Sequence, residues 1–516
     1  MSGHLIVGPI LGFRGAKEGR WYTSALVVLR GTATPPQLTV SFNGMFQAAA
    51  EAVLLKTFAD RQVWRMDWWV RQTDSEQSVT YAVNGGELFE YVVPEQNKPL
   101  RICYGSCFGV HTLKDLNKVK SKNEMWKVLQ RVHEQKPYHL FFMGGDQIYS
   151  DQIWETVLPL RDWLSKPLKK RVMSPFTTDM QQQVEQFYFD LYCQIWRQKL
   201  PAATMSRIPI LMMWDDHDIF DGWGSYVPEQ QDCAVFQGIY REARECFRVF
   251  QLQAKHDDDL GELTVLGKSG YTYAHRMGNL ALVALDLRSE RTLNQVMSQE
   301  TWNRLLAWME AELKDKLMPD GSRQAGCKHL LFMSGIPVVS ADLTLLEAAL
   351  DVEPGQQRME DDLKDQWLSR AHQQERLRLI HRLLHFSQES GCRVTIVSGD
   401  AHVAFLGYIQ SERERKTCAE ANIINQLTSS AMVNLPPPAL VVYMMEKLLA
   451  GKVEEVDRGI TARLLKFPGS SRRIISARNW LSLVVDEQLR IWADWYVEGQ
   501  ENPYTKVIHP VGTPPA

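Results

Sequence analysis

Residues 138–151, YHLFFMGGDQIYSD, determine the fold class that we expect for this chain. Residues 138–143 form a short apolar run typical of a buried strand, and Gly-Gly-Asp follows directly. The same order recurs at residues 100–104 before Gly-Ser-Cys, 208–213 before Trp-Asp-Asp-His, 280–285 before Asp-Leu-Arg, and 394–397 before Ser-Gly-Asp-Ala-His. In layered α/β proteins, functional groups gather beyond the carboxyl ends of buried strands. The pattern therefore predicts an α/β fold, with layers of sheet flanked by helices and one composite site.

The first part of the chain has a different pattern. Short apolar runs at 25–29, 62–70 and 89–93 are separated by Gly, Pro, Asn and Asp turns, which predicts a small N-terminal all-β sandwich domain over residues 1–98. A larger domain would occupy residues 99–516. It would contain helices over 184–195 and 374–388, and a C-terminal helix over 441–449. A β-hairpin formed by 480–485 and 489–496 would follow.

Composition excludes several classes of protein. The chain has 516 residues and a net charge of −3, so charge does not indicate a nucleic-acid partner or an anionic membrane. No apolar stretch approaches the length of a membrane span, and the first residues lack the pattern of a secretory signal, so we expect a cytoplasmic protein. The eight cysteines are scattered, which favours buried thiols over a disulfide framework. The sequence does not indicate an oligomeric state.

Three of the strand ends carry groups that could bind metal ions. Asp146 follows a strand and Tyr149 stands three residues on, although a helix cap and a core aromatic would fit the same residues. Residues 214–221, WDDHDIFD, crowd four carboxylates and an imidazole after an apolar strand, and cations would relieve their repulsion. Asp400 and His402 lie two residues apart, where a capping Asp and a structural His are the alternative.

These blocks resemble the PhoD-like alkaline phosphatase and phosphodiesterase family, a branch related to the calcineurin-like metallophosphoesterases. Ser106-Cys107, residues 285–291 and residues 334–337 match further blocks in the same order, and the similarity spans roughly residues 100–435. The resemblance implies that Cys107, Tyr149 and His402 bind Fe³⁺. It implies that Asp146 bridges this ion to a second one, Ca²⁺ in that family, held also by Asp216 and Asp400.

Two departures from the general superfamily bear on the metals. General metallophosphoesterases carry an Asp-x-His block on the first strand and a histidine before the block near Pro337, whereas this chain has Gly105-Ser106-Cys107 and Ser334-Gly335. The PhoD-like branch shares both changes. Thiolate and phenolate suit a trivalent iron and oxygen ligands suit calcium, although Mn²⁺ or Zn²⁺ could substitute.

The resemblance implies hydrolysis of a small or medium phosphoester, monoester or diester, by water activated between two cations. His217 would face the substrate and donate a proton to the leaving oxygen. Arg288 would neutralise phosphate charge, with an ion pair to Glu290 or another neighbour as the alternative. Two other readings stay open at this point: a catalytically degenerate binding scaffold, and a non-haem iron oxidoreductase, for which the blocks supply only His402 and His217.

Overall fold

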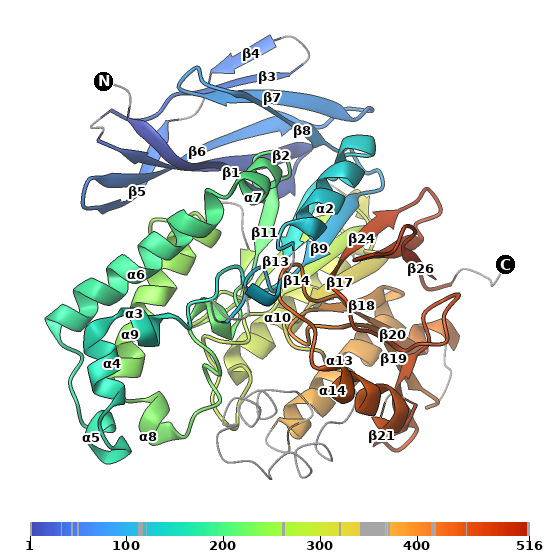
Figure 1. Ribbon diagram of the computed structural model, residues 1–516. Coiled ribbons are helices and arrows are strands. Elements are labelled where there is room, and N and C mark those ends of the chain that lie inside the picture. Colours follow the sequence, from blue (N-terminus) through green and yellow to red (C-terminus); the bar gives the residue numbers. More distant parts are fainter. Residues whose placement is uncertain are drawn as a thin grey trace.

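The apolar runs of the sequence form strands of two ten-stranded sheets (Figure 1). The computed structural model describes residues 3–31, 34–42, 45–48, 51–111, 117–119, 121–257, 259–260, 264–318, 321–340, 367, 369, 372–413, 419–449 and 451–512; for 45–48, 419–420 and 448–449 only the backbone is described.

The first sheet has the strand order β26 (Tyr504–Ile508), β25 (Ile491–Val497), β24 (Asn479–Val485), β9 (Arg101–Gly105), β10 (Leu140–Met143), β11 (Ile210–Met212), β1 (His4–Lys17), β2 (Arg20–Arg30), β6 (Arg61–Arg71) and β5 (Ala52–Phe58). The second has the order β12 (Thr264–Val265), β13 (Tyr273–Met277), β14 (Leu280–Ala284), β17 (His329–Met333), β18 (Arg393–Ser398), β20 (Ile423–Thr428), β19 (Ala404–Ser411), β22 (Ile460–Leu465) and β21 (Val453–Asp457), with β23 (Ile474–Ile475) paired to β19.

The two sheets share a core. One continuous cluster of buried apolar side chains includes Phe141 and Leu211 of the first sheet and Leu331 and Val397 of the second. The Tyr273 hydroxyl also donates a hydrogen bond of 2.9 Å across to the carbonyl of Met212. The molecule is therefore built as two layers of sheet packed on each other, which confirms the predicted α/β layered class.

The N-terminal strands form two antiparallel sheets. Strands β1, β2, β6 and β5 pack on a four-stranded sheet of β4 (Met45–Ala48), β3 (Leu38–Phe42), β7 (Gln77–Val83) and β8 (Leu88–Val93), through contacts such as Trp68 Nε1 to Tyr91 Oη at 2.8 Å. In addition, β1 lies parallel to β11, with Gly12 opposite Ile210. Hydrogen-bonded sheet is thus continuous from the N-terminal strands into the central layer.

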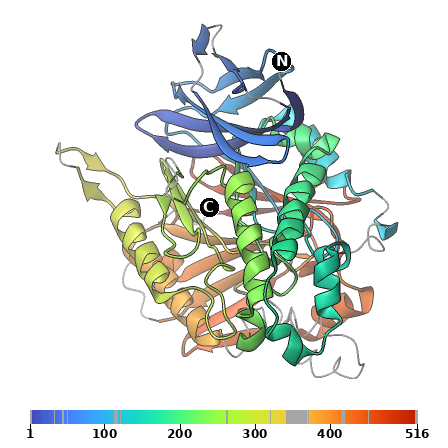
Figure 2. The ribbon, with the colours of Figure 1, turned by 90° about the vertical axis from the view of Figure 1, so that its left-hand side faces the viewer.

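Helices cover both layers. They are α2 (Glu124–Gln135), α3 (Ile153–Thr156), α4 (Leu158–Leu164), α5 (Leu168–Val172), α6 (Thr178–Trp196), α7 (Lys199–Met205), α8 (Pro228–Gln231), α9 (Ala234–Cys246), α10 (Gln299–Leu313), α13 (Gln373–Ser390) and α14 (Ala439–Met444). Figure 2 shows α6 and α9 side by side, and Gln181 and Glu242 join them through a hydrogen bond of 3.1 Å. In the part of the chain that the structure describes, none of the helices is long and apolar enough to cross a bilayer.

Candidate metal centre

The predicted donors follow strands that end at the same place. Cys107, Asp146 and Asp216 come after β9, β10 and β11, which are parallel neighbours in the first sheet. Asp400 and His402 come after β18 of the second sheet. The backbones of the two sheets join here, because Met432 N, beyond β20, donates to Ser106 O at 3.0 Å. The site therefore lies where the carboxyl ends of both sheets meet.

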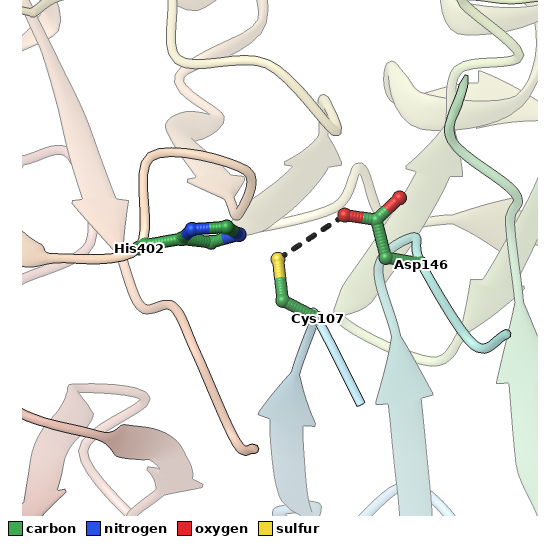
Figure 3. Close-up of side chains that lie close together, drawn as sticks. All are labelled: Cys107, Asp146 and His402. Atoms are coloured by element: carbon green, nitrogen blue, oxygen red, sulfur yellow. Dashed lines mark hydrogen bonds between the residues drawn. The ribbon is translucent and has the colours of Figure 1, made fainter. Parts of the chain in front are cut away.

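A first group of donors surrounds Cys107. Cys107, Asp146 and His402 each offer a ligand atom within 4.8 Å of the others (Figure 3). The Cys107 sulfur lies 3.3 Å from Asp146 Oδ2. Tyr149 adds a fourth donor, since its hydroxyl lies 3.4 Å from Asp146 Oδ2 and 3.3 Å from His402 Nε2.

Further groups adjoin the first. Asp146, Asp216 and His217 have ligand atoms within 4.8 Å of one another, and so do Asp215, Asp216 and Asp400. Asp146 belongs to both the first group and the second, and Asp216 links the second to Asp400. The structure thus brings together all six residues that the sequence suggested as ligands.

Four of these six residues have left-handed backbone conformations. The φ angles are 56° at Cys107, 56° at Asp146, 60° at Asp400 and 51° at His402. Non-glycine residues avoid this region, and each such residue costs of order 1 kcal/mol. Strain of this kind persists where the surrounding structure fixes the backbone, as it does in binding sites.

The Asp218 carboxylate fixes the two central loops relative to each other. Its Oδ2 accepts hydrogen bonds from the backbone N–H groups of Asp146 at 2.9 Å and Asp215 at 3.0 Å, and its Oδ1 accepts one from Ile148 at 3.1 Å. Gly145 between the loops has a φ of 116°, and a Cβ there would lie 2.7 Å from Asp215 Cβ. The glycine is needed for this close approach.

The electrostatics of the site call for cations. Within the described residues, the buried Asp146 Oδ1 has no hydrogen-bond partner. Burial raises the pKa of Asp146 well above its usual range, and Asp215 and Asp216 raise it further. Burial likewise raises the pKa of Cys107 and of Tyr149. Anionic donors at this depth need positive charge, so the residues present fit a metal centre.

Two neighbouring side chains point hydrogen-bond donors at these ligands. Ser430 Oγ donates to the Cys107 sulfur at 3.0 Å, and Asn434 Nδ2 donates to the Tyr149 oxygen at 2.9 Å. Both residues lie in the segment after β20, which the sequence did not single out. A strand followed by Ser-Ser is a weak signal, because the segment contains no titratable side chain.

His217 and Arg288, the two predicted catalytic residues, have different surroundings. His217 Nδ1 is hydrogen-bonded to Asp151 Oδ2 at 2.9 Å, and its ring stacks on Tyr149 with 4.5 Å between centroids. Burial opposes the charged imidazole, but Asp151, Asp216 and Asp146 outweigh it and raise the pKa of His217.

Arg288 is fully buried and contacts the carboxylates of Asp215 and Asp216. Its guanidinium forms an ion pair with Asp215 and a second one, of 3.3 Å, with Asp216. Burial opposes ionisation of Asp216, but Arg288 and His217 hold the pKa of that carboxyl below its usual range. An ion pair of the kind expected as the alternative role is present, but its partners are Asp215 and Asp216. Glu290 bonds Thr301 Oγ1 at 2.9 Å instead. A role of Arg288 in neutralising phosphate charge stays a prediction.

This chain is similar to several known proteins. An uncharacterised protein of Saccharomyces cerevisiae is 26% identical to this chain, in a match that covers 94% of this chain and 82% of that protein. The solved structure of PhoD superposes with a TM-score of 0.55 at 12% identity, over 96% of this chain and 88% of that chain, a likeness that shows the fold alone. A purple acid phosphatase from yellow lupin superposes with a TM-score of 0.49 at 9% identity, over 97% of this chain and 74% of that chain.

The family model described as PhoD related phosphatase matches residues 71–350 and 343–453, more than half of the chain. These residues include every donor discussed above. The chain therefore belongs to the PhoD related phosphatase family, and it is a metal-dependent phosphoesterase.

Proposed function

We propose that the protein is a phosphatase or phosphodiesterase that hydrolyses phosphoesters with two cations bound side by side. Cys107, Tyr149 and His402 would hold the first, Asp216 and Asp400 the second, and Asp146 would contact both. The observation that carries this proposal is the position of Asp146, which lies in two adjoining donor groups and has a buried Oδ1 without a hydrogen-bond partner among the described residues.

The donor types favour different ions in the two positions. A thiolate and a phenolate stabilise a trivalent ion, and Ser430 and Asn434 donate to these two atoms as they would to anions. Carboxylates alone suit a hard ion. We infer Fe³⁺ in the first position and Ca²⁺ in the second, with Mn²⁺ or Zn²⁺ as substitutes. The bound cations would neutralise phosphoryl charge and supply a water of lowered pKa as the nucleophile.

The chain itself would position the substrate and move a proton. The hydrogen bond from His217 Nδ1 to Asp151 fixes the imidazole ring and leaves Nε2 as the nitrogen that can donate to the leaving oxygen. Asp151 is itself held, because the backbone N–H of Asp221 donates to its Oδ1 at 2.9 Å. Arg288 acts through Asp215 and Asp216 and is a positioning residue.

Metal-free protein reconstituted with iron plus calcium, manganese or zinc tests this proposal. Hydrolysis of p-nitrophenyl phosphate and bis-p-nitrophenyl phosphate should require metal. It should fall by several orders of magnitude in Asp216→Asn, because a ligand charge is lost. Asp457→Asn is the matched control, since Asp457 pairs with Arg413 and His381 and belongs to none of the donor groups.

Two results would contradict the proposal. One is full turnover by a folded Asp216→Asn variant. The other is a metal-loaded wild type that turns over neither ester, which would favour a binding scaffold. With iron bound, an absorption band in the visible that disappears in Tyr149→Phe would identify the phenolate as a ligand.

A further inference from the structure

We propose that His111 is a specificity-determining residue that donates a hydrogen bond to the leaving group of the phosphoester. This inference rests on the proposed function, because it assumes that an ester is cleaved beside His217. Nothing in the sequence marked His111, which lies four residues after Cys107 in a segment without helical or strand periodicity.

The backbone that leads to His111 is hydrogen-bonded to the loop after β10, which carries Asp146 and Tyr149. The N–H of Cys107 donates to Gly145 O at 3.1 Å, and the N–H of Phe108 donates to Asp146 O at 2.9 Å. Gly109 lies against Tyr149 so closely that a Cβ would come within 2.5 Å of the tyrosine ring. The position of His111 is therefore fixed relative to the donors Asp146 and Tyr149.

The His111 ring packs edge-on against the rings of the site. Its centroid lies 4.4 Å from that of His217, 5.2 Å from that of Tyr149 and 6.2 Å from that of His402. All three ring pairs are close to perpendicular, with interplanar angles of 82°, 76° and 66°. Any group that contacts His217 and the first donor group is thus also adjacent to His111.

Exposure distinguishes His111 from His217 and from Asp151, which is hydrogen-bonded to His217. Its side chain is 25% exposed, whereas those of His217 and Asp151 are 6% and 8% exposed. His111 therefore lies between the buried site and solvent, on the side of His217. Because the two ring centroids are 4.4 Å apart, a leaving group that takes a proton from His217 would lie next to His111, whose imidazole N–H would bind it.

Two substitutions separate a hydrogen bond from ring packing. His111→Gln keeps an N–H donor without the ring, and His111→Phe keeps a ring without the donor. If the hydrogen bond is what matters, His111→Ala and His111→Phe lower kcat/KM for p-nitrophenyl phosphate about fivefold to tenfold, and His111→Gln recovers most of the loss. The inhibition constant of orthophosphate should stay unchanged in all three variants, because orthophosphate has no leaving group.

The controls keep this test independent of folding and of the proposed function. His385→Ala, at a 60% exposed histidine on α13, should leave both kcat/KM for p-nitrophenyl phosphate and the inhibition constant of orthophosphate unchanged. Recovery by Phe but not by Gln would overturn the proposal, and so would a parallel loss of orthophosphate affinity, since either would mean that His111 only supports the site. A wild type inactive towards all esters with every metal would instead refute the proposed function.

Discussion

Replacing Arg288 by methionine tests whether this residue supports the carboxylates or binds phosphate. The side chain is completely buried and pairs with Asp215 and Asp216, so Arg288→Met leaves two buried carboxylates without their guanidinium. Removing one member of a buried ion pair costs about 3 to 5 kcal/mol. For a chain of this length, that corresponds to a fall of about 3 to 5 °C in Tm.

The fall in Tm caused by Arg288→Met should depend on whether metal is bound. In the presence of a chelator, we expect the whole fall in Tm. With saturating metal we expect a smaller one, because bound cations replace part of the missing positive charge at Asp216. Differential scanning calorimetry with and without metal measures both. Arg376→Met is the matched control: Arg376 is a buried arginine whose bonds of 2.6 and 2.8 Å to Glu454 lie outside the donor groups, so its loss should be the same in both conditions.

One result would refute this reasoning. If Arg288→Met melts like the wild type in the presence of a chelator, while KM for esters and the inhibition constant of orthophosphate both rise, Arg288 binds the phosphoryl group directly. Unchanged melting together with unchanged kinetics would equally contradict a positioning role.

The remaining predictions concern the ligands and loops. Metal binding should release protons, and the affinity for metal should fall as pH falls. The reason is that burial raises the pKa of Cys107 and Tyr149, while the metal binds their deprotonated forms. Calorimetry in buffers of different ionisation enthalpy should show that Cys107→Ser releases about one proton fewer. His402 should contribute no proton, since burial, with His111 and His217, lowers its pKa to about 3. Asp218→Ala should lower Tm and weaken metal binding, because it removes the acceptor of four buried backbone N–H groups. Unchanged metal content would contradict this. Gly145→Ala should reduce metal content, measured by elemental analysis, because its Cβ would collide with Asp215.

Local sequence pattern was sufficient to predict the strands that end at the site and the donors after three of them, whereas Cys107 was assigned only through the family resemblance. Residues 138–143, for instance, contain β10, and Gly391 ends α13 with a φ of 66° as expected. These features depend on short-range periodicity and on backbone conformation, which a sequence displays directly.

Pairings between distant segments could not be predicted in the same way. The parallel contact of β1 with β11 joins residues about two hundred positions apart, and no local pattern encodes it. The same limit applies to Arg288, whose partners lie 73 and 72 residues away rather than in its own block. His111, Ser430 and Asn434 were missed because their roles arise only from the surroundings that the fold gives them.

The left-handed backbone conformations described above have opposite effects on folding and on metal binding. They occur at Cys107, Asp146, Asp400 and His402. Glycine adopts such conformations freely, so a glycine at any of these positions would relieve local strain while deleting a donor. Among variants of Cys107, the glycine form should therefore be more heat-resistant than the alanine form, although neither retains the thiol. Tight metal binding and maximal stability of the empty protein cannot both be reached by the same residue at these four positions.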